Sequence, residues 1–413
     1  MIEPGATLDR ASQPTAPAAS QVAATAPRRR WLPSSTVLAF GGVIGWSAFL
    51  LFSVEPLIGR VVLPVFGGTP AVWATTLFFF QAVLLLGYLY GHLSVTRLGL
   101  WRGALLHGVL LAVAAVALLV APARAADLRN PAIPDVINLV GMLAATIGLP
   151  AFVLTTTTPL VSAWFAAVRS SGGEAAGEGA AADDAYWLYA LSNAGSLLAL
   201  LAYPFVVEPR LGLSAQRGVW AAGFVLFGLA ILAVAWWATR RVGSWAPTDE
   251  AVSQSTSMAT VAAPTWRRRL TWLLLAAVPS GLLSAVTTFI ATDLVSAPLL
   301  WLVPLAIYLV TFIIAFSARG RRLVPAAIVA APAAVTLMWV PYGSAGGWPI
   351  LPLVVLMYGG LGVVATALHG RLALDRPEPA RLTEFYLVVS IGGALASAFV
   401  ALLAPVLFPG VWE

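Results

Sequence analysis

The chain has 413 residues, of which 60% are hydrophobic and only 10% are charged, and it contains no cysteine. Soluble domains carry about 25% charged residues, so this composition excludes ordinary soluble domains and predicts apolar helices in a lipid bilayer. The lack of cysteine excludes disulfides, thiol catalysis and cysteine-based metal sites. The net charge of +6 comes from arginines in short loops at the ends of apolar runs, which indicates membrane topology rather than a nucleic-acid-binding face.

Residues 1–31 are rich in Ala, Pro, Thr and Ser, which predicts a disordered tail. Three arginines, Arg28 to Arg30, come directly before the first apolar run. That run is too long for the core of a cleaved signal peptide, and no small-residue cleavage site follows it. The sequence therefore favours a first transmembrane helix over a secretion signal.

Eleven apolar runs are long enough to cross a bilayer. They lie at 35–54, 71–92, 103–121, 136–168, 186–207, 217–238, 270–293, 298–317, 323–342, 349–368 and 384–408. The run at 136–168 exceeds one crossing and contains Pro150 and Pro159, so we expect a tilted or broken helix there.

A polar linker at 239–269 divides these runs into an N-terminal half at 32–238 and a C-terminal half at 270–413. With the N-terminus inside, 18 of the 23 arginines fall on the inner side, which includes the linker. Because inner loops are enriched in Arg and Lys, we expect a multi-pass protein of the inner or plasma membrane with a cytoplasmic N-terminus and linker.

The fifth runs of the two halves share a spacing of similar residues. Trp187, Ser192, Gly195 and Leu197 correspond to Phe385, Ser390, Gly393 and Leu395. Small residues at such positions let helices approach closely, although short matches in Ala- and Leu-rich helices also arise by chance. Repeated halves joined by a cytoplasmic linker are typical of major-facilitator-type transporters.

The expected fold is therefore an all-α polytopic membrane protein with about 11 transmembrane helices in two pseudo-repeated halves, six before the linker and five after it. A protein with six helices in each half needs one more helix than this sequence supplies. We accordingly expect the sequence to be truncated, or a split piece of a longer protein.

Several stretches resemble the membrane portion of fused major-facilitator/spermidine-synthase-like proteins. They are FSVEPLIGR (52–60), PVFGGTPAVW (64–73), FFQA (79–82), GYLY (87–90), YALSNAGS (189–196), TTFIATD (287–293) and LTEFY (382–386). The resemblance implies a membrane module associated with polyamine-type chemistry. Family members carry a soluble aminopropyltransferase- or methyltransferase-like domain after the last helix; that domain is missing here, so the family's catalytic residues have no counterparts.

Charges inside or at the edge of membrane spans are costly and mark functional candidates. Glu55 and Arg60 lie at the outer end of the first run. Three roles are open to Glu55: binding a cation such as a polyamine, pairing with Arg60, or lying at headgroup level before Pro56. Asp293 ends the seventh run on the same side, so each half supplies one carboxylate there. Such a pair suits a cationic substrate, and two independent interfacial carboxylates are the alternative.

Uncharged polar residues also lie within the runs. Gln81 and Asn193 are suited to interhelical amide hydrogen bonds or, alternatively, to substrate contacts. Thr155 to Thr158 precede a proline, where hydroxyls bond freed carbonyls or line a broken-helix binding site. Thr383 and Glu384 open the last run, where a helix cap and a first-turn acid are expected.

Nothing in the sequence marks a self-contained enzyme. His92, His107 and His369 are scattered and lack paired carboxylates, so we expect no metal site, and a proton relay through His107 is the less favoured alternative. No nucleophile elbow, phosphate loop or HExxH motif appears. We therefore assign no catalytic, cofactor-binding or metal-binding residue and no cofactor.

Three hypotheses follow. The first is a transporter-like protein in the lipid bilayer that moves a small cationic solute, such as a polyamine, by rocking of its halves. The second is a non-transporting membrane anchor or scaffold for a spermidine synthase-like domain or protein. The third, an enzyme acting within the bilayer, is the least favoured because catalytic motifs are lacking. None of them involves nucleic acid.

Overall fold

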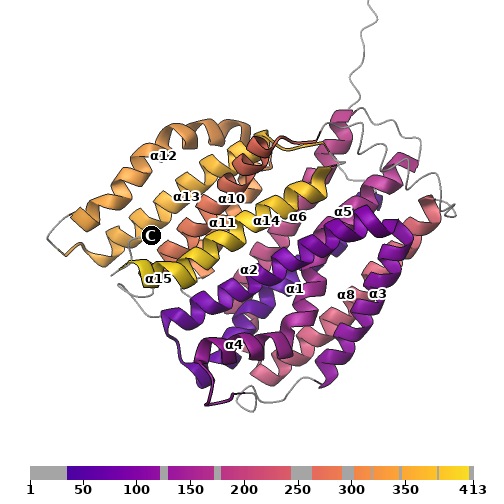
Figure 1. Ribbon diagram of the computed structural model, residues 1–413, viewed down its shortest axis with the longest axis horizontal. Helices are drawn as coiled ribbons and strands as arrows, with labels where there is room; N and C mark the ends of the chain where they lie inside the picture. The colour runs from indigo at the N-terminus through magenta and orange to yellow at the C-terminus, as the bar shows by residue number, and fades with distance from the viewer. Residues whose placement is uncertain are drawn as a thin grey trace, which may run out of the picture. The chain divides into compact units, whose positions relative to one another are not determined.

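A computed structural model describes residues 35–120, 129–171, 178–242, 263–290, 302–317, 320–343, 347–378 and 381–408. Every regular element in these ranges is a helix (Figure 1). The predicted all-α class is therefore confirmed.

The helices follow the apolar runs of the sequence. The first half contains α1 (Ser35–Phe66), α2 (Pro70–Leu93), α3 (Gly99–Val120), α4 (Asp135–Leu143), α5 (Leu149–Ser171), α6 (Glu178–Ala202), α7 (Glu208–Arg210) and α8 (Leu213–Val242). The second half contains α10 (Trp266–Phe289), α11 (Leu302–Ala315), α12 (Gly320–Gly343), α13 (Ile350–Leu374), α14 (Leu382–Ala398) and α15 (Ala404–Leu407). Short π-helical turns join some of them: η1 (Ser94–Leu98), η3 (Ala144–Gly148), η4 (Tyr203–Val207) and η7 (Phe399–Leu403).

Nine continuous helical segments in the described ranges are long and apolar enough to cross a membrane. One of them, Ala71–Val120, has 50 residues, and Gly99 within it has a left-handed backbone (φ 71°) that separates α2 from α3. The apolar helix α11 is shorter than these segments. With α2 and α3 counted separately and α11 included, the arrangement agrees with the prediction of six helices before the linker and five after it.

The helices differ from the predicted apolar runs in three places. The first helix does not end at residue 54 but continues through Pro56 and Pro64 to Phe66. Proline is tolerated in membrane helices because neighbouring groups satisfy the backbone that it frees. The run at 136–168 is helical throughout, with the π-helical turn η3 between α4 and α5 and with Pro159 inside α5, so of the two alternatives a tilted helix stays a prediction. The linker ends at 239 and 269 fall inside α8 and α10.

The two halves repeat the same helix packing. α1 packs on α5 and α6 in the first half, as α10 packs on α13 and α14 in the second. Figure 1 shows α10, α13 and α14 side by side. In both halves the fifth helix also ends in a π-helical turn, η4 after α6 and η7 after α14. These shared features confirm the predicted pseudo-repeat.

Glycine permits the closest of these contacts. A Cβ atom at Gly195 of α6 would overlap the backbone carbonyl of Gly45 in α1. In the second half the equivalent contact is made one residue earlier than the sequence alignment predicts, because Gly392 of α14 abuts the carbonyl of Leu273 in α10. Gly393, the residue aligned with Gly195, faces side-chain oxygens instead.

Gly195→Ala should lower the thermal unfolding midpoint in detergent, because the methyl group forces α1 and α6 apart and overpacking costs roughly 1–3 kcal/mol. Gly42→Ala is the matched control, since a Cβ at Gly42 of α1 meets nothing within 4 Å. Equal midpoints for the two variants would contradict the close backbone packing.

Candidate functional site

The halves meet along a surface that we call the seam. It is formed where α2 of the first half packs on α14 of the second, and where α6 packs on α11. Each contact joins the second helix of one half to the fifth helix of the other. The sequence-predicted polar candidates Gln81 and Asn193 lie on α2 and α6, two of these four helices.

Glu55 lies well inside α1 rather than at its end, and only 8% of its surface is exposed. Its Oε2 atom is buried without a hydrogen-bond partner among the described residues. Arg60 does not neutralise it in the described pairs, because the Nη1 atom of Arg60 lies 3.7 Å from Oε1 of Glu208. An unpaired charge at the middle of a membrane helix costs about 3 kcal/mol, so such a residue is a functional candidate.

Helix geometry directs Glu55 toward the seam. Residues three before and four after a helical position share its face. Phe52, three residues earlier, packs on a leucine cluster that includes Leu200 of α6, Leu283 of α10 and Leu302 of α11. Gly59, four residues later, lies against the indole ring of Trp73 in α2. Glu55 therefore occupies the face of α1 that meets both halves.

Gln81 reaches across the seam. Its Oε1 atom and the Oγ atom of Ser280 would each lie 3.4 Å from a Cβ added to Gly393. Ser280 Oγ is in turn 2.9 Å from Tyr308 Oη. An amide from the first half and a pair of hydroxyls from the second therefore converge on one glycine of α14, which leaves room for them because it has no side chain.

Asn193 is buried, with an exposed fraction of 8%. Its Nδ2 atom donates to the carbonyl of Tyr189 at 2.9 Å, so this hydrogen bond lies within α6. The sequence had favoured a hydrogen bond between helices. Beside it, Ser192 Oγ is 3.3 Å from Thr158 Oγ1 of α5. The structural interpretation of the threonine run is supported, because Thr155 and Thr156 bond carbonyls one turn earlier in α5.

Aromatic rings from both halves contact one another across the seam. We call this group the aromatic cluster: Tyr88, Tyr189, Phe312, Phe316 and Tyr386. Tyr189 of α6 stacks on Tyr386 of α14, with ring centroids 5.1 Å apart and planes 20° apart. Phe316, directly after α11, meets Tyr189 edge-on at 5.2 Å. The rings join both halves without burying charge. Sequence reasoning missed this cluster, although tyrosines in the quoted GYLY, YALSNAGS and LTEFY stretches were a usable signal.

One end of the bundle, which we call the linker face, is where α2 ends and α10 and α14 begin. There His92 Nδ1 lies 3.0 Å from Thr383 Oγ1, across the seam. Glu384 pairs with Arg269 at 2.5 Å and with Arg381 at 3.3 Å. Thr383 and Glu384 therefore contact His92 of α2 and Arg269 of α10. The predicted cap is wrong because the N-cap residue of α14 is Arg381, whereas the predicted first-turn acid, Glu384, is confirmed.

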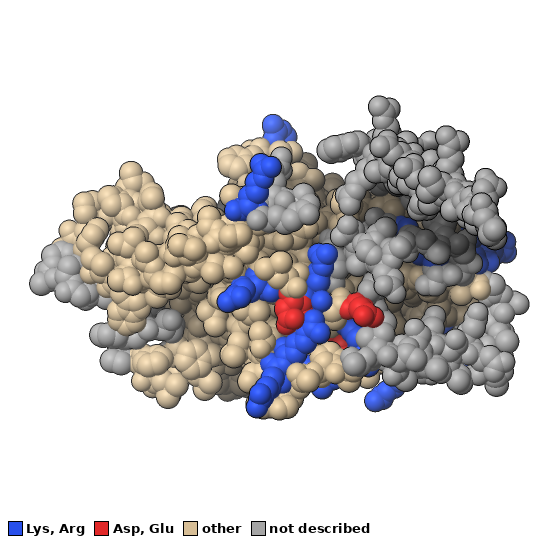
Figure 2. Space-filling model, turned by 90° about the horizontal axis from the view of Figure 1, so that it is seen from above, with Lys and Arg blue, Asp and Glu red and all other residues tan. Residues whose placement is uncertain are grey.

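Figure 2 shows basic and acidic side chains together on one face of the molecule. Among the linker-face pairs, Arg268 Nε lies 3.0 Å from Asp375 Oδ1. Trp272 Nε1 donates to the other carboxylate oxygen of Asp375 at 2.9 Å. Asp375 follows α13 directly, so it ties the end of that helix to the beginning of α10.

Two histidines are fully buried, His369 near the seam and His107 inside the first half. His369 Nδ1 lies 2.8 Å from Thr311 Oγ1, and the ring of Phe312 stacks on its imidazole at 3.7 Å. His107 Nδ1 lies 3.5 Å from Thr156 Oγ1. In the described part of the chain, no group of three or more His, Cys, Asp or Glu side chains is placed to bind a metal.

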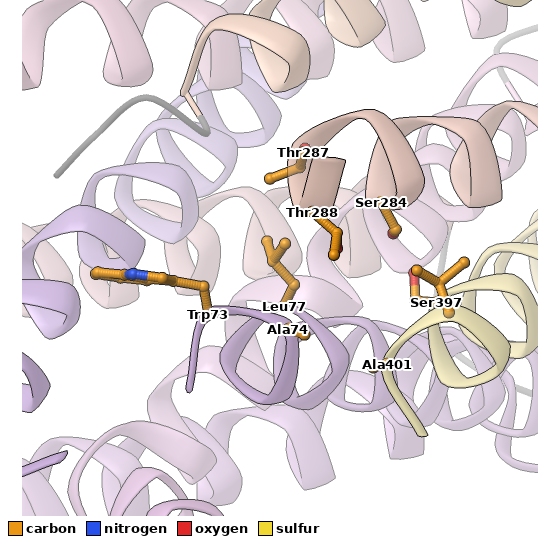
Figure 3. Close-up of a pocket in the computed structure, with 9 residues that line it drawn as sticks. Trp73, Ala74, Leu77, Ser284, Thr287, Thr288, Ser397 and Ala401 are labelled. Carbon is orange, nitrogen blue, oxygen red and sulfur yellow. The ribbon is translucent and has the colours of Figure 1, made fainter. Parts of the chain in front are cut away.

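A small cavity of about 20 Å³ lies between α2, α10 and the end of α14 (Figure 3). The hydroxyls of Ser284, Thr287 and Thr288 on α10 and of Ser397 on α14 border it, as do Trp73 and Leu77. A cavity of this volume holds about one water molecule. Hydroxyls from the second half and apolar side chains from α2 thus share a solvent-sized space within the seam.

Asp293 lies outside the described residues. Glu55 lies inside α1 rather than at its outer end. The predicted pairing of its carboxylate with that of Asp293 stays a prediction. Of the five predicted site residues, Glu55, Gln81 and Asn193 face or border the seam. Arg60 belongs to a separate, half-exposed ion pair with Glu208.

No protein-family model and no curated protein matches the chain. Several solved structures, in contrast, are similar to the chain. A proton:xylose symporter of the major facilitator superfamily, XylE bound to 6-bromo-6-deoxy-D-glucose, superposes with a TM-score of 0.54 at 14% identity, covering 91% of this chain and 89% of that one. An inward-open structure of XylE from E. coli gives 0.50 at 14% identity, covering 91% and 90%.

A bacterial homologue of the human drug peptide transporters PepT1 and PepT2 gives a TM-score of 0.48 at 15% identity, covering 88% of both chains. At identities this low a likeness shows the fold alone, and it is the XylE structures that establish it here. The chain is thus a multi-pass membrane protein with the fold of major facilitator superfamily transporters, and the spermidine-synthase part of the resemblance stays a prediction.

Asp375→Asn should lower the thermal unfolding midpoint, because it removes the charge partner of Arg268 and weakens the acceptor of Trp272. We expect a loss of about 1–2 kcal/mol, since the pair is partly exposed but one hydrogen bond reaches a buried indole. The control is Asp135→Asn, which removes a more exposed partner of Arg129 and should change the midpoint little. A smaller decrease of the midpoint in Asp375→Asn than in Asp135→Asn would contradict a stabilising role for the contacts of Asp375 with Arg268 and Trp272.

Proposed function

We propose that this protein is a transporter that moves a small cationic solute along the seam by rocking of its two halves. The observation that carries the proposal is Glu55, a buried side chain in a membrane helix whose Oε2 atom has no hydrogen-bond partner in the described part of the chain. A carboxylate is the group that a cation requires, and its cost in the bilayer is offset when a cation binds.

The surroundings of Glu55 support a cationic cargo. Arg60, the nearest arginine in the sequence, lies within reach of Glu208 instead, which leaves the Glu55 carboxylate available. Further along the seam, the amide of Gln81 and the hydroxyls of Ser280 and Tyr308 offer acceptors for N–H groups. The tyrosine faces of the aromatic cluster suit a cation moving past them, because ring faces attract cations.

A polyamine is the specific cargo that we propose, and this part rests on the resemblance to spermidine-synthase-like fusions. Polyamines carry several ammonium groups on a flexible apolar chain, which fits a path with one carboxylate, neutral acceptors and rings. A proton:xylose symporter is among the similar structures, so the fold by itself does not specify an amine as the cargo.

We also propose that the N-terminus and the linker face the cytoplasm, on the arginine count. Arg267, Arg268 and Arg269 at the start of α10 belong to this side. An epitope inserted at residue 255 should be digested by protease in inside-out vesicles and protected in right-side-out vesicles. The reverse pattern would overturn the orientation.

The purified protein in proteoliposomes should take up labelled spermidine or another member of a series of mono- to tetra-amines. Glu55→Gln should reduce the uptake roughly 10- to 100-fold, because a hydrogen bond to a charged group contributes about 1.5–3 kcal/mol. Glu208→Gln is the matched control, since its carboxylate pairs with Arg60 outside the seam, and it should keep uptake within about twofold of wild type.

Uptake by Glu55→Gln equal to that of wild type would exclude Glu55 as the cation site. A wild-type protein that transports none of the amines, yet retains a spermidine synthase-like protein during purification from its host, would favour the anchor or scaffold hypothesis.

A further inference from the structure

A groove of about 910 Å³ crosses the seam on the side where α6 packs on α11. Its first wall comes from α6 and η4 and includes Leu200 and Phe205. The opposite wall comes from α11, α12 and α13 and includes Ile314, Leu323 and Val363. The groove is therefore built from both halves, and neither Glu55 nor a member of the aromatic cluster is among its lining residues.

The described walls of the groove offer no free polar side chain. Thr311 and Thr366 are the polar side chains among its lining residues. Thr366 Oγ1 donates to the carbonyl of Gly362 at 2.7 Å, and Thr311 Oγ1 lies 2.6 Å from the carbonyl of Tyr308 and 2.8 Å from His369 Nδ1. A polar ligand would lose its hydrogen bonds to water and gain none, so the groove suits hydrocarbon.

The groove opens sideways, toward the surroundings of the bundle. Phe205 is 72% exposed, Val303 is 43% exposed and Leu323 is 46% exposed. In a membrane-spanning bundle these exposed apolar side chains lie in the hydrocarbon of the bilayer, because water there would meet no polar partner. The molecules that reach this opening are therefore lipids.

The length of the groove matches one lipid chain. Leu302 and Ile314 on α11 both line it. They are twelve residues apart in the sequence, which corresponds to about 18 Å along a helix. Half of the hydrocarbon core of a bilayer measures about 15 Å. An acyl chain that extends from one leaflet to slightly beyond the midplane fills this distance.

An arginine lies on the helical face of α12 that lines the groove, because Ala326, four residues after Arg322, is a lining residue. Arg322 is exposed and comes directly before Leu323 in the first turn of α12. The adjacent Val324 packs on Gly370, near the end of α13, so this end of the groove lies toward the linker face. An arginine beside a helix N-terminus favours an anionic group such as a lipid phosphate.

We propose that the groove binds one acyl chain of an anionic phospholipid from the leaflet on the linker face, with the phosphate held at Arg322. Because the walls belong to both halves, the bound chain stabilises this arrangement of the seam. The lipid is then a structural ligand that is independent of the transported solute.

The first test compares lipids of identical chains. Phosphatidylglycerol should raise the thermal unfolding midpoint of the delipidated full chain more than phosphatidylcholine does, and native mass spectrometry should show one retained phosphatidylglycerol. Ala327→Phe, which fills the groove, should remove both effects, whereas Ala112→Phe on α3, away from the groove, should keep them. Retention and stabilisation unchanged in Ala327→Phe would overturn the groove as the site.

The headgroup contact has its own control pair. Arg322→Gln should abolish the preference for phosphatidylglycerol over phosphatidylcholine, because the phosphate loses its charge partner. Arg97→Gln, which removes another exposed arginine, in η1 after α2, should preserve the preference. A preference that survives in Arg322→Gln would show that the headgroup lies elsewhere.

A second measurement needs no variant and therefore does not depend on the folding of Ala327→Phe. Phosphatidylglycerol with a diazirine on its chain, added to wild-type protein, should label peptides of α6–η4 and α11. Labelling spread evenly over lipid-facing helices such as α3 and α8 would show bulk lipid alone and would overturn the proposal.

Discussion

The packing of the second helix of each half on the fifth helix of the other decides where the functional groups of this chain lie. Helices in hydrocarbon already satisfy their own backbones, so side-chain packing and a few polar contacts hold the halves together. Here the stacked rings of Tyr189 and Tyr386 supply the packing, and His92 with Thr383 supplies a polar contact. When contacts of this kind separate, they leave no buried charge without a partner, which is compatible with halves that move against each other.

Glu55, in contrast, places a buried carboxyl group between the halves. On the same helical face, Phe52 packs on a leucine cluster built from both halves and Gly59 lies against Trp73 of α2, so the carboxyl group lies where the halves meet. The groove at α6 and α11 lies on the same seam but is lined by apolar side chains that face the bilayer, whereas Glu55 is polar. A polar path between the halves and an apolar groove at their edge are therefore consequences of one packing arrangement.

The number of helices, their order and the repeat were predictable because long apolar runs and small-residue spacings report membrane helices directly. The end of the first helix was not, because a proline such as Pro56 stops helices in water but is tolerated in a bundle. Partners of single polar groups were also beyond the sequence. Asn193 bonds its own helix, and Thr383 meets a histidine far away in the chain, since such contacts depend on how helices are rotated. The aromatic cluster escaped prediction for the same reason.

Transport along the seam requires the seam to open to water, and the absence of cysteine makes a direct measurement possible. Asn193→Cys in lipid nanodiscs should react with a membrane-impermeant maleimide, more slowly than the exposed Thr96→Cys but measurably. Leu139→Cys, buried within the first half, should stay unreacted over the same period. Protection of the residue 193 thiol equal to that at residue 139 would contradict an opening seam.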